Sequence, residues 1–397
     1  MSQFQAPTFS PTIVSGARTT GDIVSGRIKP DYDGIFSYQP NGNAVSLLLV
    51  KARKKRPVTQ YQFNVLVKDR YPYRDSVNNA AGYDADDVTI VVANGDRFYA
   101  RAVVLVPRTM ERFLVQSVSS NTLTIEQRGL GNTASPLING EELIILGDSY
   151  PENAAVGTVK SIQERITYNY TQTIRTPFSF SGRDMNTDMF GGPDMTTEEK
   201  WQASQHTQKI EHNILWGARA TFNDATSGKP NTTMGGAQYW LAGNNEWDLN
   251  NVPFTWDNFV EYLEYGMYYG NGGRFGTRTK YFFGSSAYMT QMERWGHDKL
   301  RLVPSDDVFG LNIKKLQTTH GDVMLVDHPL FEGQNRDKAF LIDLNHVRFC
   351  YHQGRDTHIR RDVGDPGVDG KTHEILSDVS IEFNLPLSSG YIFGLSA

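Results

Sequence analysis

A glycine-rich hexapeptide is the first segment whose spacing matches a known chemistry. Residues 129–134 are Gly-Leu-Gly-Asn-Thr-Ala, which fits the G-x-G-x-x-A pattern of dinucleotide-binding loops. That chemistry requires a helix directly after the loop, because the helix N-terminus must face the pyrophosphate. Here residues 135–140 follow, and their sequence Ser-Pro-Leu-Ile-Asn-Gly is typical of a loop. We therefore interpret residues 129–134 as a turn between two strands.

Two serines lie where a nucleophile would sit, between an apolar run and a predicted helix. Residues 281–283 predict a strand, Gly284 predicts a sharp turn, and Ser285 and Ser286 follow. The G-x-S-x-G pattern of a nucleophile elbow lacks its second glycine, because Tyr288 occupies that position. Capping of the next helix explains both serines without any catalysis.

Histidines and aspartates gather in residues 343–373, a combination that can hold a divalent metal ion. Neither an H-E-x-x-H motif nor the spacing of a facial triad occurs there. His346 and His352 are six residues apart, so a strand would place them on one face as weak co-ligands. Residues 362–370 predict a wide turn, because glycine and proline dominate and the carboxylate series of a calcium loop is missing. The remaining members of the segment are His358, His373, Asp356, Asp362, Asp365 and Asp369.

Basic residues 51–56 are the strongest charge cluster of the chain. Such a run contacts nucleic acid in some proteins, but a solvated helix end is its usual explanation. A third use is an ion-pair contact with an acidic surface of another copy, such as Asp84, Asp86 and Asp87. No catalytic triad, carboxylate pair or phosphate loop remains. The sequence therefore predicts no enzyme, and no catalytic, cofactor-binding or metal-ligating residue.

The composition is that of a protein with hydrophobic cores and no covalent cross-links. Of the 397 residues, 39% are hydrophobic and 21% are charged, and the net charge is −5. This charge disfavours a protein that wraps nucleic acid with most of its surface. Cys350 is the only cysteine, which excludes an intrachain disulfide and a cysteine-based zinc site. Since neither a secretory signal nor a membrane helix is recognisable, we expect an intracellular protein without membrane contact.

The first half of the chain divides into segments of different character. Residues 1–42 are rich in proline and glycine without an apolar period, which predicts an extended arm. Residues 43–56 predict a short helix with a basic end, stopped by Pro57. Residues 58–151 predict a small β-barrel or sandwich inserted in the chain, because β-branched runs alternate with turns. These runs are 63–67, 88–92, 102–106, 113–115, 122–125 and 143–146.

The second half mixes long and short elements. Residues 158–181 predict a long strand or hairpin arm without one dry face, which we expect to lie across another surface, such as that of a neighbouring chain. The longest helix is predicted over 196–222, with a capping box from Thr196 to Glu199. Helices are also predicted after Thr255 and after Ser285 or Ser286, the second ending at Gly296, and strands at 281–283, 323–326, 339–342, 347–351 and 379–385. Because no βαβ rhythm occurs, the fold class is α+β.

Several short sequence segments occur in a characteristic order along the chain. They are residues 111–118, 121–125 and 128–129, residues 174–182, and residues 209–211 with 216–219. Together with the order of arm, β arm, long helix and mixed domain, they make the chain similar to the major capsid proteins of tailed bacteriophages. These proteins have the Hong Kong 97-type coat fold, and the segments resemble those of a subfamily with an inserted β domain. The resemblance covers nearly the whole chain.

The resemblance implies an α+β, Hong Kong 97-like fold built from named parts. One departure is that no long charged scaffold helix precedes the arm, which implies a separate scaffolding protein or a leader removed before Met1. The implied parts are an N-terminal arm (1–42), an extended-loop region (43–57 and 152–190), the inserted β domain (58–151), the spine helix of the peripheral domain (191–224), the axial domain (225–337), and peripheral-domain strands with a C-terminal return to the axial domain (338–397).

The implied function is that of a major capsid (head) protein. Such a protein self-assembles into hexamers and pentamers of an icosahedral virion shell around double-stranded DNA, and assembly takes place in the host cytoplasm. Its implied partners are itself and scaffolding, portal and decoration proteins, with packaged DNA near it but not specifically bound, and without any cofactor or membrane. Segments 1–42 and 158–190 are expected to complete their folds on neighbouring subunits by strand addition. Two alternatives stay open: a tail or decoration protein, and a metal-dependent enzyme that uses residues 343–373.

Overall fold

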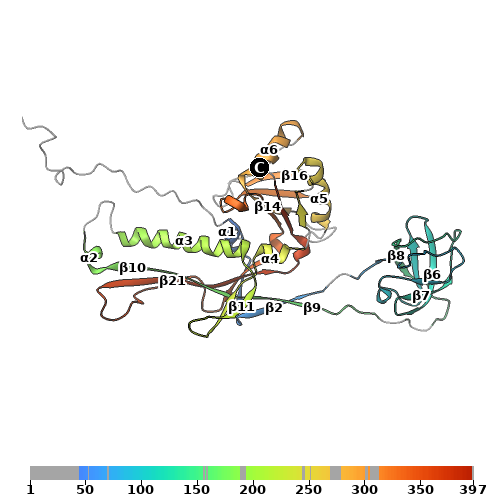
Figure 1. The fold of residues 1–397 in the computed structure, drawn as a ribbon, viewed down its shortest axis with the longest axis horizontal. Helices are drawn as coiled ribbons and strands as arrows, with labels where there is room; N and C mark the ends of the chain where they lie inside the picture. Colours follow the sequence, from blue (N-terminus) through green and yellow to red (C-terminus); the bar gives the residue numbers. More distant parts are fainter. Residues whose placement is uncertain are drawn as a thin grey trace, which may run out of the picture. The chain divides into compact units, whose positions relative to one another are not determined.

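The structure is a computed structural model that describes most of the chain after the predicted N-terminal arm. The described residues are 44–51, 53–68, 71–154, 157, 160–187, 194–243, 246–250, 252–268, 279–299, 303–304 and 313–395, so the predicted arm 1–42 lies outside them. The chain divides into two compact units (Figure 1). The barrel unit contains Gln62–Asn169 and Glu382–Leu385, and the main unit contains the rest.

A seven-stranded mixed sheet is the larger of the two main sheets in the main unit. Its strand order is β13 (Glu246–Asp248), β22 (Gly390–Phe393), β18 (Ala339–Ile342), β14 (Thr279–Gly284), β17 (Asp322–Asp327), β16 (Ile313–Gln317) and β15 (Val303–Pro304). Helices α5 (Trp256–Tyr268) and α6 (Ser286–Lys299) pack on it through an aromatic core that includes Trp247, Phe259, Phe282 and Tyr288. Two expectations were wrong here. Strand β18, assigned to the peripheral sheet, pairs with β14, and α6 continues past Gly296 to Lys299.

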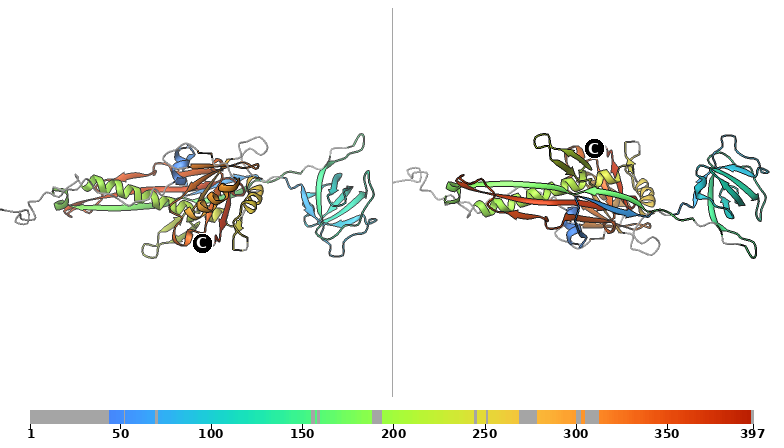
Figure 2. Two further views of the ribbon diagram at one scale, coloured as in Figure 1. Left: turned by 90° about the horizontal axis from the view of Figure 1, so that it is seen from above. Right: turned by 90° about the horizontal axis from the view of Figure 1, so that it is seen from below.

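A second sheet in the main unit carries the longest helix. Its order is β1 (Lys55–Val58), β19 (Val347–His352), β21 (Gly370–Phe383) and β10 (Gln172–Ser181), and β20 (His358–Arg360) also pairs with β21. Strands β10 and β21 are antiparallel and in register from Gln172–Val379 to Ser181–Gly370. Helix α3 (Asp194–Trp216) runs alongside this pair (Figure 2).

The expectation that residues 158–181 lack a dry face was wrong for β10. Its side chains alternate, and Ile174, Thr176, Phe178 and Phe180 are buried while their neighbours are exposed. The buried face packs on the same chain, because α3 and the core around Ile375 cover it. The sequence hid this pattern, since Thr176 is polar and its burial depends on a partner on α3.

The first helix is shorter than expected. Helix α1 (Ala44–Lys51) ends in a Schellman motif, in which the Lys54 N–H donates to the Leu49 carbonyl and Arg53 adopts a φ of +56°. The hydrogen bond from the Lys54 N–H to the Leu49 carbonyl is 2.9 Å long. Residues 55–58, predicted as a basic helix end and its stop at Pro57, instead form β1, which is parallel to β19. Proline is tolerated there because β1 is an edge strand.

Helix α3 begins at Asp194 and ends at Trp216, so both predicted ends were wrong. Thr196 lies inside the first turn rather than at the cap. Gly217 stops the helix: a side chain there would lie 2.5 Å from the Asn213 carbonyl and 2.6 Å from that of Met234. Close backbone approach of this kind is the reason for a glycine. The chain then forms the hairpin β11 (Ala220–Asn223) and β12 (Pro230–Thr233).

The barrel unit contains a six-stranded antiparallel sheet. Five of the six predicted runs form strands of it, but run 63–67, expected in the barrel, forms β2 outside this sheet, and β3 was not predicted. The order is β3 (Arg74–Ser76), β8 (Glu142–Asp148), β5 (Ala102–Val106), β6 (Glu111–Ser119), β7 (Thr122–Gln127) and β4 (Thr89–Val91). A bridge between Val77 and Val92 joins the two edges, with two backbone hydrogen bonds of 2.9 Å around it. The sheet therefore closes into a barrel around an apolar core that includes Phe98, Phe113 and Leu123.

The remaining elements are short. Strands β2 (Gln62–Val67) and β9 (Arg165–Tyr170) pair with each other as a two-stranded ribbon. Helices α2 (Gly182–Met185) and α4 (Ala237–Leu241) and the 3-10 turns η3 (Gly95–Arg97), η4 (Gly333–Asn335), η5 (Leu344–His346) and η6 (Pro386–Ser388) complete the described part. Among the described helices, none has the length and apolarity to cross a lipid bilayer.

Candidate functional site

The two motifs that suggested catalysis have structural roles. Residues 129–134 lie in the loop between β7 and β8, and no helix follows them. Gly129 and Gly131 have φ angles of +64° and +73°, which glycine adopts without strain. The buried Ser285 hydroxyl donates to the Arg336 carbonyl at 2.8 Å, while Ser286 starts α6 and is exposed. Among the described residues, neither serine hydroxyl is hydrogen-bonded to a histidine or a carboxylate.

The histidines of 343–373 are distributed over several elements. His346 belongs to η5, which precedes β19, so the expectation that it shares a strand face with His352 was wrong. The His358 Nδ1 donates to the Asp356 carbonyl at 2.6 Å, and the His373 Nδ1 accepts from the Asp362 N–H at 3.0 Å. Within the described part of the chain, no three histidine, cysteine or acidic side chains converge on one point.

Within the basic run 51–56, Lys55 makes its contacts inside the chain. Lys55 forms an ion pair with Asp356, and its ammonium lies 4.6 Å from the centre of the Tyr351 ring. The acidic loop proposed as its partner on another copy is tied to its own barrel. The Arg128 guanidinium donates to the carbonyls of Asp84 and Asp87, at 3.3 and 3.0 Å.

A buried carboxylate on α3 joins three parts of the main unit. Glu211 is fully buried, and its Oε1 accepts from the Val45 N–H at 2.7 Å while Oε2 accepts from the Ser46 N–H at 3.0 Å. These amides belong to the first turn of α1, where unpaired N–H groups favour a negative charge. Glu211 Oε1 also accepts from Nε2 of the buried His328 at 2.9 Å. The Glu211 carboxylate therefore fastens α1 and the end of β17 to α3.

The tautomer of His328 follows from its second contact. The Leu330 N–H donates to His328 Nδ1 at 3.2 Å, which makes Nδ1 an acceptor and leaves Nε2 as the N–H that faces Glu211. The His328 N–H donates to the Gly284 carbonyl at 3.0 Å, at the end of β14. Both carboxylate oxygens of Glu211 and both ring nitrogens of His328 are bonded within the main unit, so this pair is a structural junction.

A second buried histidine fastens α3 to the sheet below it. His206 is 1% exposed, its Nδ1 lies 3.0 Å from the Thr176 hydroxyl of β10, and its Nε2 lies 2.6 Å from the Ser377 hydroxyl of β21. Burial, together with the charge of Lys209, lowers the pKa of His206 from 6.5 to about 4. The imidazole is therefore neutral at pH 7 and exchanges hydrogen bonds with both hydroxyls.

This histidine predicts an acid-sensitive main unit. Because the folded-state pKa of His206 lies below its unfolded value of 6.5, the unfolded state binds the proton more tightly. We expect its contribution to stability to fall as the pH drops from 6.5 towards 4, by up to about 1.4 kcal/mol per pH unit and about 3 kcal/mol in total. Urea midpoints at pH 7, 6 and 5 measure the loss. The His206→Gln variant should show a flatter pH dependence than the wild type, whereas a variant at the exposed His212 should not.

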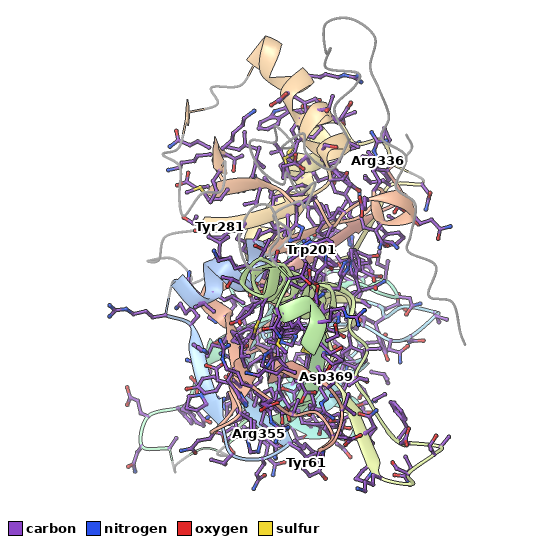
Figure 3. All side chains as sticks on the ribbon, turned by 90° about the vertical axis from the view of Figure 1, so that its left-hand side faces the viewer. Tyr61, Trp201, Tyr281, Arg336, Arg355 and Asp369 are labelled. Carbon is purple, nitrogen blue, oxygen red and sulfur yellow. The ribbon has the colours of Figure 1, made fainter. Side chains whose placement is uncertain are left out.

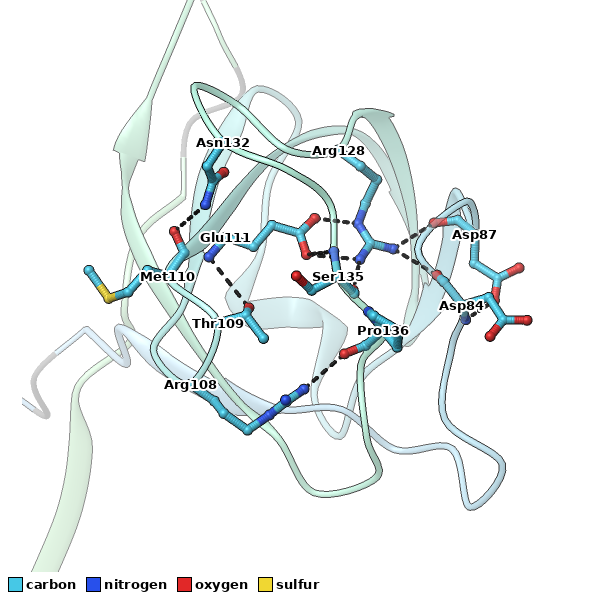
Figure 4. Close-up of polar contacts among 10 residues, drawn as sticks. All are labelled: Asp84, Asp87, Arg108, Thr109, Met110, Glu111, Arg128, Asn132, Ser135 and Pro136. Carbon is cyan, nitrogen blue, oxygen red and sulfur yellow. Dashed lines mark hydrogen bonds and ion pairs between the residues drawn. The ribbon is translucent and has the colours of Figure 1, made fainter.

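The barrel has a buried ion pair at one end (Figure 4). The Arg128 Nε and Nη2 donate to the two carboxylate oxygens of Glu111 at 2.6 and 3.0 Å, and Glu111 is fully buried. The Ser135 N–H donates to Glu111 Oε2 at 3.0 Å. Burial alone would raise the pKa of Glu111, but the hydrogen bonds from Arg128, Ser135 and Gly129 and the charge of Arg128 outweigh burial and hold that pKa below its ordinary value. Arg128 thus binds the carboxylate and three loop carbonyls at once.

Sequence reasoning missed these buried polar residues, although a signal was present. Glu111 alternates with Phe113 and Val115 on the inward face of β6. Glu211 precedes Ile214 and Leu215 by three and four positions on the apolar side of α3, and both are fully buried. A charged residue in phase with an apolar stripe indicates a buried partner.

Surfaces suited to other chains remain exposed. In the part that the structure describes, strands β2 and β9 form a two-stranded sheet with each other. This ribbon exposes Leu66 and Ile166, at 65% and 60%. Trp201 on α3 is 48% exposed (Figure 3), and Phe222 on the hairpin β11–β12 is 49% exposed. Exposed apolar side chains of this size indicate interaction surfaces.

Comparisons with known proteins agree on one class. The family model described as SU10 major capsid protein matches residues 19–396. A protein named "Major capsid protein" from Pseudomonas phage PaMx41 is 21% identical over 301 residues, which cover 72% of this chain and 70% of that relative.

Solved structures share the fold. The chain aligns with the capsid asymmetric unit of cyanophage A-1(L) with a TM-score of 0.51 and 11% identity, over 94% of this chain and 98% of that one. It aligns with the capsid of a native GTA particle with a TM-score of 0.50 and 9% identity, over 94% of this chain and 97% of that one.

Proposed function

Because the chain belongs to the SU10 major capsid protein family, we infer that it is the major capsid (head) protein of a bacteriophage and forms the shell of the virion. The observation that carries this conclusion is the family match over residues 19–396. The α+β, Hong Kong 97-like fold expected from the sequence is confirmed along 94% of the chain. The protein is thus a structural component, in keeping with a chain whose suspected catalytic motifs serve its own fold.

The shell is built by self-assembly. Copies of the chain form hexamers and pentamers that close into an icosahedral particle around double-stranded DNA. The ribbon β2–β9 supports this mechanism, since its exposed apolar side chains Leu66 and Ile166 suit contacts with other subunits. Each contact is weak, but symmetry repeats it many times and a closed shell becomes very stable.

The parts of the chain take the following roles. Residues 1–42 are the N-terminal arm, and segments 43–57 and 152–190 frame the extended loop. The ribbon β2–β9 reaches neighbouring subunits, whereas β10 completes its fold on α3. Segment 58–151 is the inserted domain, and it contains the barrel together with β2 of the ribbon. Helix α3 in 191–224 is the spine, the seven-stranded sheet belongs to the axial domain of 225–337, and residues 338–397 supply peripheral strands and the return of β18 and β22 to the axial sheet.

Other partners follow from this role. Scaffolding, portal and decoration proteins would contact the shell, and assembly would take place in the host cytoplasm. The net charge of −5 supports non-specific proximity to packaged DNA rather than tight binding, because phosphates repel a negative surface.

Electron microscopy of the purified protein, alone and with candidate scaffolding protein, tests the function. We expect closed, roughly spherical shells. Tubes or isolated trimers would indicate a tail or decoration protein instead, and would contradict the proposal.

Deleting residues 1–30 tests the mechanism. We expect the truncated chain to remain soluble and to form no shells, because the arm is required for contacts between subunits. Negative-stain microscopy measures particle formation. A full-length chain with a neutral tag of similar length before Met1 is the control and should still assemble. Normal shells from the truncated chain would refute the role of the arm.

A further inference from the structure

The barrel unit has a groove that neither its fold nor the shell function explains. The groove has a volume of about 430 Å³ and is lined by residues from the start of the barrel, β8 and the segment that leaves it. The residues that matter for the argument are Tyr71, Tyr73, Tyr99, Tyr150, Asp148 and Lys160. Four tyrosines on one groove present aromatic planes and hydroxyl groups together.

The tyrosines are positioned by the barrel. The Tyr71 hydroxyl donates to the Arg97 carbonyl at 3.0 Å, and the Tyr71 and Tyr73 ring centres are 5.8 Å apart with planes inclined by 57°. The Tyr73 carbonyl accepts from the Ile145 N–H of β8 at 2.8 Å. Tyr73 and Tyr150 are 48% and 39% exposed, so a ligand can reach both rings. The Tyr71 and Tyr99 rings are therefore held by the barrel, the latter against its apolar core, whereas the Tyr73 and Tyr150 rings are exposed to solvent.

A local irregularity in β8 shapes the groove wall. The register between β5 and β8 shifts because Val103 opposes Gly147 while Val104 opposes Ile145, which leaves Leu146 as an extra residue. A bulge of this kind redirects side chains at a barrel rim. Leu146 lines the groove and is 52% exposed.

The charges of the groove balance. Among the described residues, the Asp148 carboxylate has no hydrogen bond or ion pair. The Lys160 ammonium donates to the carbonyls of Asp96 and Phe98. Burial, together with the charge of Asp148, raises the pKa of Tyr99, and burial also raises that of Tyr71, so both phenols stay neutral at pH 7. The groove thus offers a free acceptor, neutral hydroxyls and no net charge.

We propose that this groove binds a neutral oligosaccharide. The apolar C–H face of a pyranose ring suits an exposed tyrosine plane, and its hydroxyl groups can bond to neutral phenols and donate to the exposed Asp148 carboxylate. The open shape fits two or three sugar rings rather than one enclosed molecule. The groove contains no residue of the ribbon β2–β9 that the proposed assembly uses, so binding can be measured apart from shell formation.

Two other ligand classes fit less well. An organic cation would interact with the tyrosine faces, but the Lys160 ammonium in the same groove offsets its attraction to the Asp148 carboxylate. A proline-rich peptide would also match an aromatic groove, but proline has no N–H and cannot donate to the Asp148 carboxylate. Sugar hydroxyls carry no charge and can donate to the Asp148 carboxylate.

Saturation-transfer NMR and calorimetry on the full-length protein test the proposal. The probes are maltotriose, cellotriose, mannotriose and chitotriose, with choline and a proline-rich decapeptide as competitors from the other classes. We expect at least one trisaccharide to bind with a millimolar or lower dissociation constant. The Tyr73→Ala and Tyr150→Ala variants should weaken binding at least fivefold, and Asp148→Asn, which keeps the side-chain shape, at least threefold.

The matched control is Tyr83→Phe, because the Tyr83 hydroxyl donates to no sugar-facing group and instead pairs with the Val91 N–H at 2.8 Å. This variant should bind the trisaccharide like the wild type. Thermal melting of each variant verifies that the barrel is folded. The proposal is overturned if no trisaccharide binds below 10 mM, if binding survives Tyr73→Ala and Tyr150→Ala, or if only choline or the peptide binds. Shell formation is scored separately, so its failure does not affect this result.

Discussion

We expect the Glu211→Ala variant to lose about 3–5 kcal/mol of stability in the main unit, enough to remove most of the folded protein from solution. The substitution leaves three buried donors without an acceptor: the N–H groups of Val45 and Ser46 and Nε2 of His328. Each buried unsatisfied donor costs about 1–3 kcal/mol, and a cavity replaces the carboxylate. Soluble yield and the urea midpoint measure the effect.

The Glu211→Gln variant separates charge from shape. Its amide oxygen still accepts from one donor, but its NH₂ group faces another, so we expect a smaller loss of about 1–2 kcal/mol. Hydrogen exchange of the α1 amides should rise in both variants, because Glu211 satisfies the first turn of that helix. Glu261→Ala on the exposed side of α5 is the control and should change little. Unchanged α1 protection in Glu211→Ala would contradict the junction role.

Elements that are specified by a short stretch of sequence were predicted correctly. Five strands of the barrel sheet follow from β-branched runs and turns, and Thr255 caps α5, whose first backbone bond joins the Phe259 N–H to the Thr255 carbonyl at 2.9 Å. The resemblance to capsid proteins rested on the order of such elements, and order survives errors of a few residues at each boundary.

Distant partners decided where prediction from sequence failed. Strand β10 was expected to lack a dry face because its partner β21 lies about 200 residues later in the chain. The acceptor for the first turn of α1 is 166 residues away. The end of α3 depends on Met234, which approaches Gly217 from beyond the hairpin. Each of these features becomes visible only when the chain has folded, because tertiary contacts override local propensity.

The Arg128→Ala variant should destabilise the barrel by about 3–5 kcal/mol, because it leaves the Glu111 carboxylate buried without its partner. Arg128→Lys should also be costly, about 2 kcal/mol or more. A lysine cannot reproduce the two parallel hydrogen bonds to Glu111 together with those to the carbonyls of Asp84, Asp87 and Ser135. Thermal melting of the barrel, followed by near-ultraviolet circular dichroism of its tyrosines, measures both losses.

A second ion pair of the barrel provides the comparison. Arg108 donates to both carboxylate oxygens of Glu141 at 2.8 and 3.0 Å, but the Arg108 side chain is 49% exposed, against 6% for Arg128. We expect Arg108→Ala to cost less than Arg128→Ala, about 1–2 kcal/mol, because the Arg108 side chain is half exposed and water can take its place beside the Glu141 carboxylate, whose own side chain is only 3% exposed. Because the pKa of Glu111 is held below its usual value, the stability that Arg128 supplies is present near neutral pH and declines as the pH falls below about 4.5. Equal losses of stability for Arg128→Ala and Arg108→Ala at pH 7 would show that burial does not set the strength of the Arg128–Glu111 pair. They would contradict the stabilising role of its buried position at the end of the barrel.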